Sequence, residues 1–493
     1  MKKGMKKIMA LMLAVMMVCA VAAVPVAAGE LIETDYFTYD VLEDGTAEIA
    51  RYWGPEEPEE TITIPAEVGG HTVSSIGESA FSVLRSVKTI VIPDSVTKIG
   101  GSAFESCESL ESVNIPDGVA SIGEDAFSDC ISLKSLDMPK SVESIGDMAF
   151  LGCTSLSAIN VDAENPNYKS VDGVLFTKDG TRLISYPAGK SNKAYAIPDG
   201  VTSTDMFAFA YNNSLESLGI PESLAEISDL SFESCSALKE INVAEGNAVF
   251  SSADGVLLNK DKTELILYPA GRTDESYTVP ENVKKIGGTA FFDCDNLRSV
   301  AVGDNVEEIS YSTFALCDNL ESVKLSKNLK AIPYRCFADC PALNNVVIPS
   351  GVTSIGEGAF VNAFGLKTIT IPKTVTEIGW AAFANTEVET IFYDGSKEEW
   401  DNIDIKQGNE GISWYAVVFP SQSDMRLGDL SGDGNVTTVD ALNCIKAAVG
   451  ITKLDANQTK AADVDGDGKV TTADALLILK YSVGIIKKFP VEA

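Results

Sequence analysis

The chain has 493 residues, 45% of them hydrophobic, and a formal net charge of −33 at pH 7. This length is too great for one ordinary domain, so at least two units are expected. The apolar fraction supports a sizeable core and excludes wholesale disorder. The acidic charge excludes nucleic acid as a default partner, because phosphate would be repelled over most of the surface.

The start of the chain predicts an export signal. Four lysines within the first seven residues precede an almost wholly apolar run from Ile8 to Val24, and residues 26–28 offer the small side chains of a signal peptidase site. The run is too short, and too closely followed by the cleavage signal, to favour a membrane anchor. We therefore expect residues 1–28 to be a signal peptide. The mature chain is expected to start near Gly29, to lie outside the cell and to lack a membrane span.

A phenylalanine recurs with a constant period through most of the mature chain. The recurrences form three groups: Phe81, Phe104, Phe127 and Phe150; Phe209 and Phe232; Phe291, Phe314, Phe337, Phe360 and Phe383. The two gaps between the groups are equal, and each is longer than one repeat by the same amount. The spacing predicts eleven repeats with a similar 36-residue insertion placed twice.

The sequence of each repeat predicts a strand, then a bend and then a short helical turn. Residues 110–115 alternate apolar and polar side chains, which indicates a strand with one buried face, and Pro116 ends it because proline cannot donate to the ladder. Gly123 permits a tight bend, and Phe127 lies in the helical turn. So small a unit cannot bury its apolar face alone. The repeats must stack into a solenoid, on the order of 50 Å long at ~4.8 Å per turn.

Both insertions predict β-hairpins. In the first, the turn dipeptide Asp179-Gly180 lies between apolar runs at 173–178 and 181–186. The second copy runs from Gly255 to Gly271. We expect both hairpins to project from the solenoid.

Seven cysteines lie three residues after their phenylalanines: Cys107, Cys130, Cys153, Cys235, Cys294, Cys317 and Cys340. Because they are in register, they predict a buried column of small apolar side chains rather than a disulfide or metal framework. Without Cys19 in the export signal nine cysteines remain, and an odd number also argues against full pairing.

The repeat pattern L-x-x-V-x-I-P-x-x-V-x-x-I-G-x-x-A-F-x-x-C resembles the BspA-type leucine-rich repeat of bacterial surface antigens. The resemblance covers roughly residues 36–418. Residues 397–400, followed by Ile403 and Asn409, resemble that family's C-terminal closing segment. The resemblance implies an N-terminal cap over residues 29–63, a capped solenoid over 64–418, and adhesion or protein recognition at the cell surface.

Beyond a linker at residues 419–427, two stretches have the spacing of EF-hand-type calcium loops, with oxygen ligands at positions 1, 3, 5 and 12 and a glycine at position 6. The predicted ligands are Asp429, Ser431, Asp433, Asn435 and Asp440 in the first loop, and Asp463, Asp465, Asp467, Lys469 and Asp474 in the second. Asn435 and Lys469 would contribute backbone carbonyls. We expect two calcium ions. The first is expected to be the more weakly bound, because Ser431 stands where Asn or Asp is usual.

Each loop leads into a predicted helix, Ala441 to Val449 and Ala475 to Val483, with Leu442 and Leu476 as matched core positions. Two such halves over about residues 428–487 resemble a type I dockerin, here assigned to residues 428–493. The resemblance implies docking to a cohesin domain of a scaffoldin. It also implies contacts at Thr438, Val439 and Lys446 in the first half and at Thr472, Ala473 and Lys480 in the second. The cohesin class stays open, because Ile445 and Leu479 are apolar where many dockerins carry a basic residue.

Candidate catalytic residues form no motif. His71 is the one histidine, which excludes a multi-histidine zinc site, and no Ser-His-Asp or Cys-His pattern has a recognisable context. Glycosidases need only two carboxylates, but no pair among the 71 acidic residues has a motif. The sequence therefore predicts a β-rich leucine-rich-repeat solenoid plus a small all-α EF-hand-like dockerin.

The predicted function is non-catalytic recognition or adhesion outside the cell. The solenoid would bind a protein or glycan ligand, and the dockerin would hold the chain in a cellulosome-type complex or at the cell surface. A polysaccharide-degrading subunit is the alternative, since dockerins usually carry glycosidases. A docked proteinase inhibitor or an adhesin for host or microbial protein is a third possibility.

One column of the solenoid changes character along its length. Three residues before the anchoring phenylalanine, the early repeats carry mostly acids: Glu78, Glu124, Asp147 and Asp229. Glycine interrupts the column at Gly101 and Gly288, and the later repeats carry Tyr311, Tyr334, Glu357 and Trp380. An exposed row of Tyr311, Tyr334 and Trp380 would stack on a sugar chain or anchor a protein partner. The alternative is that these rings cover the edge of the core.

Overall fold

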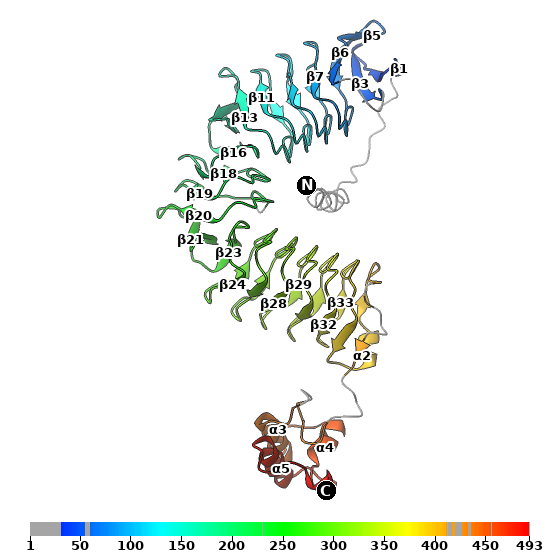
Figure 1. The fold of residues 1–493 in the computed structure, drawn as a ribbon, viewed down its shortest axis with the longest axis vertical. Coiled ribbons are helices and arrows are strands. Elements are labelled where there is room, and N and C mark those ends of the chain that lie inside the picture. Colours follow the sequence, from blue (N-terminus) through cyan, green and yellow to red (C-terminus); the bar gives the residue numbers. More distant parts are fainter. Residues whose placement is uncertain are drawn as a thin grey trace.

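The computed structural model describes residues 31–54, 60–228, 230–410, 412, 417–419, 426–431, 435–454 and 456–492. Within these ranges, no helix has the length and hydropathy that a membrane span requires. The signal peptide predicted over residues 1–28 lies outside the described residues. A long β-solenoid, drawn from blue to yellow in Figure 1, precedes a small helical unit.

Each turn of the solenoid contributes two short strands, which pair in parallel with the equivalent strands of neighbouring turns. Residues at the same position of successive repeats lie opposite each other, so that Ser299 pairs with Ser322 and Ser322 with Asn345. The sequence pattern predicted the first strand of each turn. The second strand, which is only two residues long in most turns, is additional.

The first strands of the turns are β4 (Thr61–Thr63), β7 (Thr89–Val91), β9 (Ser112–Val113), β11 (Ser135–Met138), β13 (Ala158–Val161), β17 (Ala194–Ala196), β19 (Ser217–Ile220), β20 (Glu240–Val243), β24 (Ser276–Thr278), β26 (Ser299–Ala301), β28 (Ser322–Lys324), β30 (Asn345–Val347), β32 (Thr368–Ile371), β34 (Thr390–Tyr393) and β36 (Val417–Val418). The second strands are β6 (His71–Ile76), β8 (Lys98–Ile99), β10 (Ser121–Ile122), β12 (Ser144–Ile145), β16 (Arg182–Ser185), β18 (Ser203–Thr204), β23 (Glu264–Leu267), β25 (Lys285–Ile286), β27 (Glu308–Ile309), β29 (Ala331–Ile332), β31 (Ser354–Ile355), β33 (Glu377–Ile378) and β35 (Asp404–Ile405).

The anchoring phenylalanines form stacks inside the solenoid. Rings of neighbouring turns lie with their centroids 5.0 to 6.2 Å apart. Tyr186 and Tyr268 extend two of these stacks, on Phe209 at 5.4 Å and on Phe291 at 5.3 Å. Each insertion therefore contains one further turn, anchored by a tyrosine, in addition to the eleven turns that phenylalanine anchors.

All nine cysteines within the described ranges are free and buried, and they include the seven predicted to form an in-register column. Their thiols also hydrogen bond. In six turns Sγ donates to the carbonyl oxygen of the phenylalanine one turn earlier, at 2.9 to 3.2 Å. Burial raises the pKa of the thiols of Cys107, Cys153 and Cys235 to about 12. Each of the six thiols thus links its turn to the one before it.

The prediction that the insertions project from the solenoid is wrong. The predicted hairpin around Asp179-Gly180 forms between β15 (Val174–Thr177) and β16, and β14 (Tyr168–Val171) pairs antiparallel with the other edge of β15. However, β16 also pairs in parallel with the solenoid strand β18. The side chains of Phe176 and Leu183 are buried in the core. In the second insertion, β21 (Phe250–Ala253) and β22 (Val256–Asn259) repeat the arrangement. A turn dipeptide specifies a hairpin, but the apolar faces of these strands can be buried only within the solenoid.

The two insertions also divide the hydrophobic core. Three clusters of buried side chains follow one another along the chain, and they meet at Val174 and Leu175 in the first insertion and at Val256 and Leu257 in the second. In Figure 1 the solenoid follows an arc through these regions. The aromatic stack is interrupted at the same two places.

Distinct elements cover the two ends of the solenoid. At the N-terminal end, β1 (Leu31–Glu33), β2 (Phe37–Val41) and β3 (Ala47–Tyr52) form an antiparallel sheet that joins β6 in parallel, and β5 (Glu67–Val68) pairs with β6. At the other end, α2 (Lys397–Asp401) buries Trp400 edge-on against Tyr393. The side-chain oxygen of Asn409 accepts from the Phe383 amide at 3.0 Å, in place of the carbonyl that a further turn would supply.

The helical unit contains α3 (Thr438–Ala448), α4 (Ala456–Ala462), α5 (Thr472–Ser482) and the short 3-10 helix η2 (Pro490–Glu492). Helices α3 and α5 begin three residues earlier than predicted, and α4 was not predicted. The small core contains Leu430, Ala441, Cys444, Ala462, Val464, Ala475, Ile478 and Phe489.

Candidate calcium centre and docking surface

The second predicted calcium loop brings three carboxylates together. One oxygen from each of Asp463, Asp465 and Asp467 lies within 4.8 Å of the others. Gly466 and Gly468 have φ values of +78° and +84°, which glycine adopts without strain. Their amides donate to the two oxygens of Asp463, both at 2.9 Å. The loop backbone therefore folds around the acidic side chains.

The first loop is described in part. Asp429 is buried and accepts from the Ser431 hydroxyl at 3.1 Å. Asn435 lies among the described residues, whereas Asp433 lies outside them. Ser431, Asp429 and Asp440 are thus held close together by short contacts within this loop.

The last acid of each loop caps a helix. Asp440 accepts from the amide and hydroxyl of Thr437, both at 2.8 Å, and Asp474 accepts in the same way from Thr471. The other oxygen of Asp440 accepts from the Ser431 amide at 2.7 Å. Burial acts to raise the pKa of Asp440, but these hydrogen bonds hold it below its usual value. Each acid therefore fixes its loop to the first turn of α3 or α5.

The donor set fits calcium. Every side-chain donor in the two loops is an oxygen, and hard oxygen donors in a flexible loop suit Ca²⁺ better than Zn²⁺ or Cu²⁺. Three carboxylates this close repel one another, and a divalent cation relieves that repulsion. Asp463, Asp465 and Asp467 would hold the ion in the second loop, with Asp474 and the Lys469 carbonyl completing the predicted set.

The outer faces of α3 and α5 are apolar and exposed. The prediction that Leu442 and Leu476 are core positions is wrong, because their side chains are 50% and 51% exposed. The buried positions are Ala441, Cys444, Ala475 and Ile478. Since both helices begin earlier than predicted, the first acidic residue of each helix points inward and the leucine two residues later points outward.

The predicted cohesin contacts lie on these outer faces. Thr438 and Val439 are exposed at the start of α3, and Thr472 and Ala473 at the start of α5. Lys446 and Lys480 lie in the last turns of the two helices, half-buried. Beside them lie further exposed apolar side chains: Leu442, Ile445 and Val449 on α3, and Leu476, Leu479 and Val483 on α5. Ile445 and Leu479 were expected as apolar positions next to the lysines, but the continuous exposed row was not predicted, although its three- and four-residue spacing was the available signal.

An aromatic contact joins the two ends of the helical unit. The Arg426 guanidinium donates to the Tyr481 hydroxyl at 2.6 Å and lies over its ring, and Phe489 stacks on the same ring with a centroid distance of 4.6 Å. A Cβ at Gly428 would lie 2.5 Å from the Phe489 ring, so only glycine fits there. This contact closes the unit beside the first loop.

The predicted aromatic column of the solenoid is exposed. Tyr311, Tyr334 and Trp380 are 39%, 41% and 52% exposed. Their carbonyls accept from the preceding turns at Thr289, Ser312 and Gly358, which places all three at the same position of their turns. A Cβ at Gly288 would lie 2.7 Å from the Tyr311 ring, so the glycine in this column makes room for that ring. Asp229, predicted in the acidic part of the column, lies outside the described residues.

Two family models match the chain. The BspA type leucine rich repeat region matches in six copies over residues 60–180, 188–254 and 273–389, and the dockerin type I domain matches residues 427–481. No curated protein matches.

Among solved structures, the chain is similar to a leucine rich cell surface protein from Faecalibacterium prausnitzii, at 30% identity over 78% of this chain and 99% of that chain, with a TM-score of 0.48. It is also similar to the pneumococcal vaccine antigen PcpA, at 21% identity over 80% of this chain and 99% of that chain, with a TM-score of 0.43. A leucine-rich repeat protein from Bacteroides ovatus matches at 23% identity over 79% of this chain and 99% of that chain, with a TM-score of 0.33.

Proposed function

Because the chain belongs to the BspA-type leucine-rich-repeat family and ends in a type I dockerin domain, we propose that it is a non-catalytic recognition protein carried on a scaffold. The observation that carries this proposal is the pairing of the two matched families, one a repeat scaffold and the other a docking domain. The solenoid would bind a protein or glycan ligand outside the cell, and the dockerin would fix its position in a cellulosome-type complex or at the cell surface.

Type I dockerins bind calcium, and in this chain we propose two ions, one per loop. The second loop is the better supported site, because it brings three carboxylates within 4.8 Å of one another, where a cation would offset their repulsion. The proposed ligands of the first ion are Asp429, Ser431, Asp433, Asn435 and Asp440. Those of the second are Asp463, Asp465, Asp467, Lys469 and Asp474.

The proposed partner of the dockerin is a cohesin domain of a scaffoldin. Two equivalent helix faces support this proposal. Each of the 11-residue helices α3 and α5 carries a row of exposed apolar side chains and a lysine in its last turn. A helix face of this kind gains binding energy when a partner covers it, because apolar area is removed from water.

The test is a binding assay with the full mature chain and immobilised cohesins of several classes, with calcium or with chelator. We expect calcium-dependent binding to at least one cohesin and no release of sugar from plant polysaccharides by the same preparation. Calcium-independent binding, or binding to none of the cohesins, would contradict the docking proposal. Hydrolysis of a polysaccharide would contradict the non-catalytic one.

A further inference from the structure

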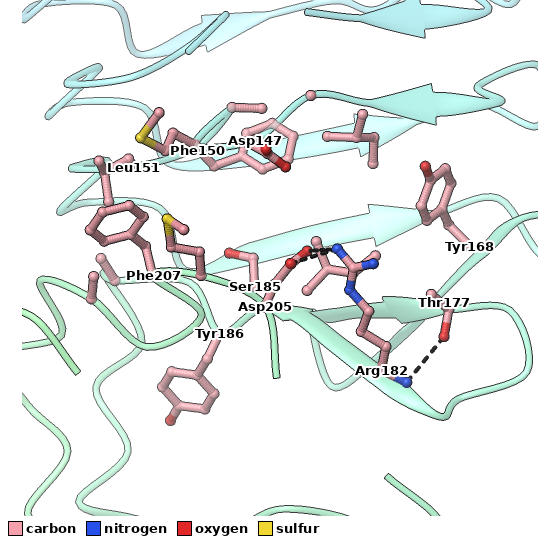
Figure 2. A pocket seen from close by; sticks show the side chains of 18 residues that line it. Asp147, Phe150, Leu151, Tyr168, Thr177, Arg182, Ser185, Tyr186, Asp205 and Phe207 are labelled. Carbon is pink, nitrogen blue, oxygen red and sulfur yellow. Dashed lines mark hydrogen bonds and ion pairs between the residues drawn. The ribbon is translucent and has the colours of Figure 1, made fainter. Parts of the chain in front are cut away.

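The first insertion contains an open pocket, whereas the equivalent position at the second insertion is almost filled. A cavity of about 210 Å³ lies where the aromatic stack is interrupted between Phe150 and Tyr186 (Figure 2). The equivalent position between Phe232 and Tyr268 holds only about 10 Å³. The two insertions pair their strands in the same way, and they differ in the side chains that line the two cavities.

Two positions explain why one pocket is open and the other closed. Ser185 and Ala210 line the first cavity. The equivalent residues at the second insertion are Leu267 and Phe292, and both line the closed cavity. Phe292 is buried and packs in a small apolar cluster with its neighbours. At these two positions small side chains at the first insertion therefore leave space that large ones fill at the second, whereas Phe207 is larger than its equivalent Thr289.

One side of the pocket is apolar. Figure 2 shows Phe150, Leu151 and Phe207 gathered on this side, and Met148 also lines it. Met148 and Phe207 have φ values of +57° and +60°, a conformation that bulky residues seldom adopt. Most other turns place a smaller or polar residue at this position, such as Ser102, Asp125 and Thr289. Large apolar side chains thus occupy this wall against the backbone preference.

The other side of the pocket is polar. The Arg182 guanidinium donates to both oxygens of Asp205, at 2.5 and 2.6 Å, across the middle of the pocket (Figure 2). Asp147 is an exposed carboxylate at the rim, and none of the described residues that line the pocket is a lysine. Since Arg182 is neutralised by Asp205, the lining carries one net negative charge from Asp147. The formal charge of −33 over the whole chain adds to this preference for a positive group.

We propose that this pocket binds a large apolar side chain of a protein or peptide ligand, with a neighbouring lysine or arginine of that ligand meeting Asp147. The volume suits one side chain rather than a cofactor, whose pockets are typically about 300–1,000 Å³. The flexible side chains of Met148 and Met206 in the lining can adapt to ligand side chains of different shape. On the polar side Arg182 and Asp205 already bond to each other. The apolar wall, with Phe150 and Leu151, offers no hydrogen bond to a sugar ring. The inference rests on the proposed recognition function and assigns a ligand class to it.

Methionine methyl NMR tests the proposal directly. Only four methionines lie beyond the predicted signal peptide: Met138, Met148, Met206 and Met425. Met148 and Met206 line the pocket, whereas Met138 is buried in the core and serves as an internal control. The calcium-loaded mature chain, labelled at the methionine methyl groups, is titrated with three probes: acetyl-Phe-Lys-Lys-amide, acetyl-Phe-Glu-Glu-amide and a cello-oligosaccharide.

We expect saturable shifts of the Met148 and Met206 signals with the basic peptide, binding at least about tenfold weaker with the acidic peptide, and no shift with the sugar. Ser185→Leu, which introduces the residue found at the second insertion, should weaken binding of the basic peptide at least about tenfold. Phe207→Thr should do the same from the opposite wall. The reciprocal variant Leu267→Ser should leave binding unchanged. An unshifted Met138 signal reports that a variant is folded.

Absence of Met148 and Met206 shifts with the basic peptide overturns the proposal, and so does saturable binding of the sugar at these signals. Equal affinity of the parent and of the folded Phe207→Thr variant overturns it too, even if Ser185→Leu does not fold. Cohesin binding by the same preparations separates the two levels. If docking persists while the pocket binds nothing, only the pocket assignment fails.

Discussion

The Tyr186 ring stacks on Phe209, and its equivalent Tyr268 stacks on Phe291, yet their hydroxyl groups have opposite environments. The Tyr268 hydroxyl donates to Asp274 at 2.9 Å. The Tyr186 hydroxyl is buried, with no hydrogen-bond partner among the described residues. One tyrosine therefore gains a hydrogen bond at the same place in the fold where the other leaves a polar atom unsatisfied.

This difference predicts opposite effects of one substitution. Tyr186→Phe should raise the free energy of unfolding by about 1 kcal/mol, because it removes an unsatisfied buried hydroxyl. Tyr268→Phe should lower it by about 1 kcal/mol, because it removes a bonded hydroxyl and leaves Asp274 with one donor fewer. Urea unfolding followed by tryptophan fluorescence and circular dichroism measures both. Shifts in the same direction would contradict the assignment.

Glu233 predicts a pH dependence of stability. Burial raises the pKa of its carboxyl to about 7, and the charge of Asp293 adds to the effect, although the hydrogen bond from Tyr211 opposes it. Since the folded pKa exceeds the unfolded value of 4.5, the fold favours the protonated form. The associated stability is complete below the unfolded pKa and is lost as the pH rises through about 7.

Relative to Glu233→Gln, the parent should therefore lose on the order of 3 kcal/mol of unfolding free energy between about pH 4 and pH 8. The difference between the two proteins across this range cancels the contributions of the other carboxyl groups. Urea denaturation at several pH values provides the measurement. Parallel profiles for parent and variant would show that Glu233 is not protonated in the fold.

Calcium should order the C-terminal unit. Asp463→Ala combined with Asp474→Ala should abolish cohesin binding and leave the solenoid intact, because the clustered acids and the helix cap are both lost. Circular dichroism and a cohesin pulldown report the two effects. Asp261→Ala, at an exposed position of the second insertion, is the matched control. Unchanged cohesin affinity in chelator would contradict the prediction.

The similarity of α3 and α5 predicts that either helix can face the cohesin. Thr438→Asp with Lys446→Ala, or Thr472→Asp with Lys480→Ala, should each weaken binding less than about threefold, because the other face remains. The four substitutions together should weaken it more than about a hundredfold. Calorimetric titration gives the affinities. A large loss from one half alone would reject dual docking.

The aromatic column predicts a second contact region on the solenoid. Replacing Tyr311, Tyr334 and Trp380 by alanine should abolish binding to a plant glycan or bacterial surface material that the parent retains, because stacked rings supply the contact area. Thermal unfolding of the variant checks that the solenoid is intact. If parent and variant bind equally well, these rings only cover the edge of the core.

The repeat itself could be predicted because Phe127 and its equivalents keep both identity and spacing. Tyr186 was missed because Ser185-Tyr186 replaces the Ala-Phe dipeptide, although the ring occupies the same place. The direction of the insertions could not be predicted, because Asp179-Gly180 specifies a hairpin without specifying what its outer strand pairs with. The thiol hydrogen bonds were also missed, because composition shows that a cysteine is small and apolar but not which carbonyl it faces.

In the C-terminal unit the loop spacing predicted which residues approach one another, and Asp463, Asp465 and Asp467 do so. The helix faces were assigned less well. Position 12 of each loop is also the third residue of a helix, so each helix starts inside its loop. This overlap rotates Leu442 and Leu476 to the outside, where they extend the proposed docking surface.

The thiol column has a consequence for the order of events during folding. Thiolate is the species that exchanges with disulfides, and burial holds the folded thiols in the protonated form. An unfolded chain, by contrast, offers nine ordinary cysteines beyond the predicted signal peptide to any oxidant in its surroundings. Each turn must therefore close over the thiol of its neighbour before that thiol meets an oxidant. In an oxidising medium, the yield of native protein therefore depends on whether the solenoid folds faster than its cysteines form incorrect disulfides.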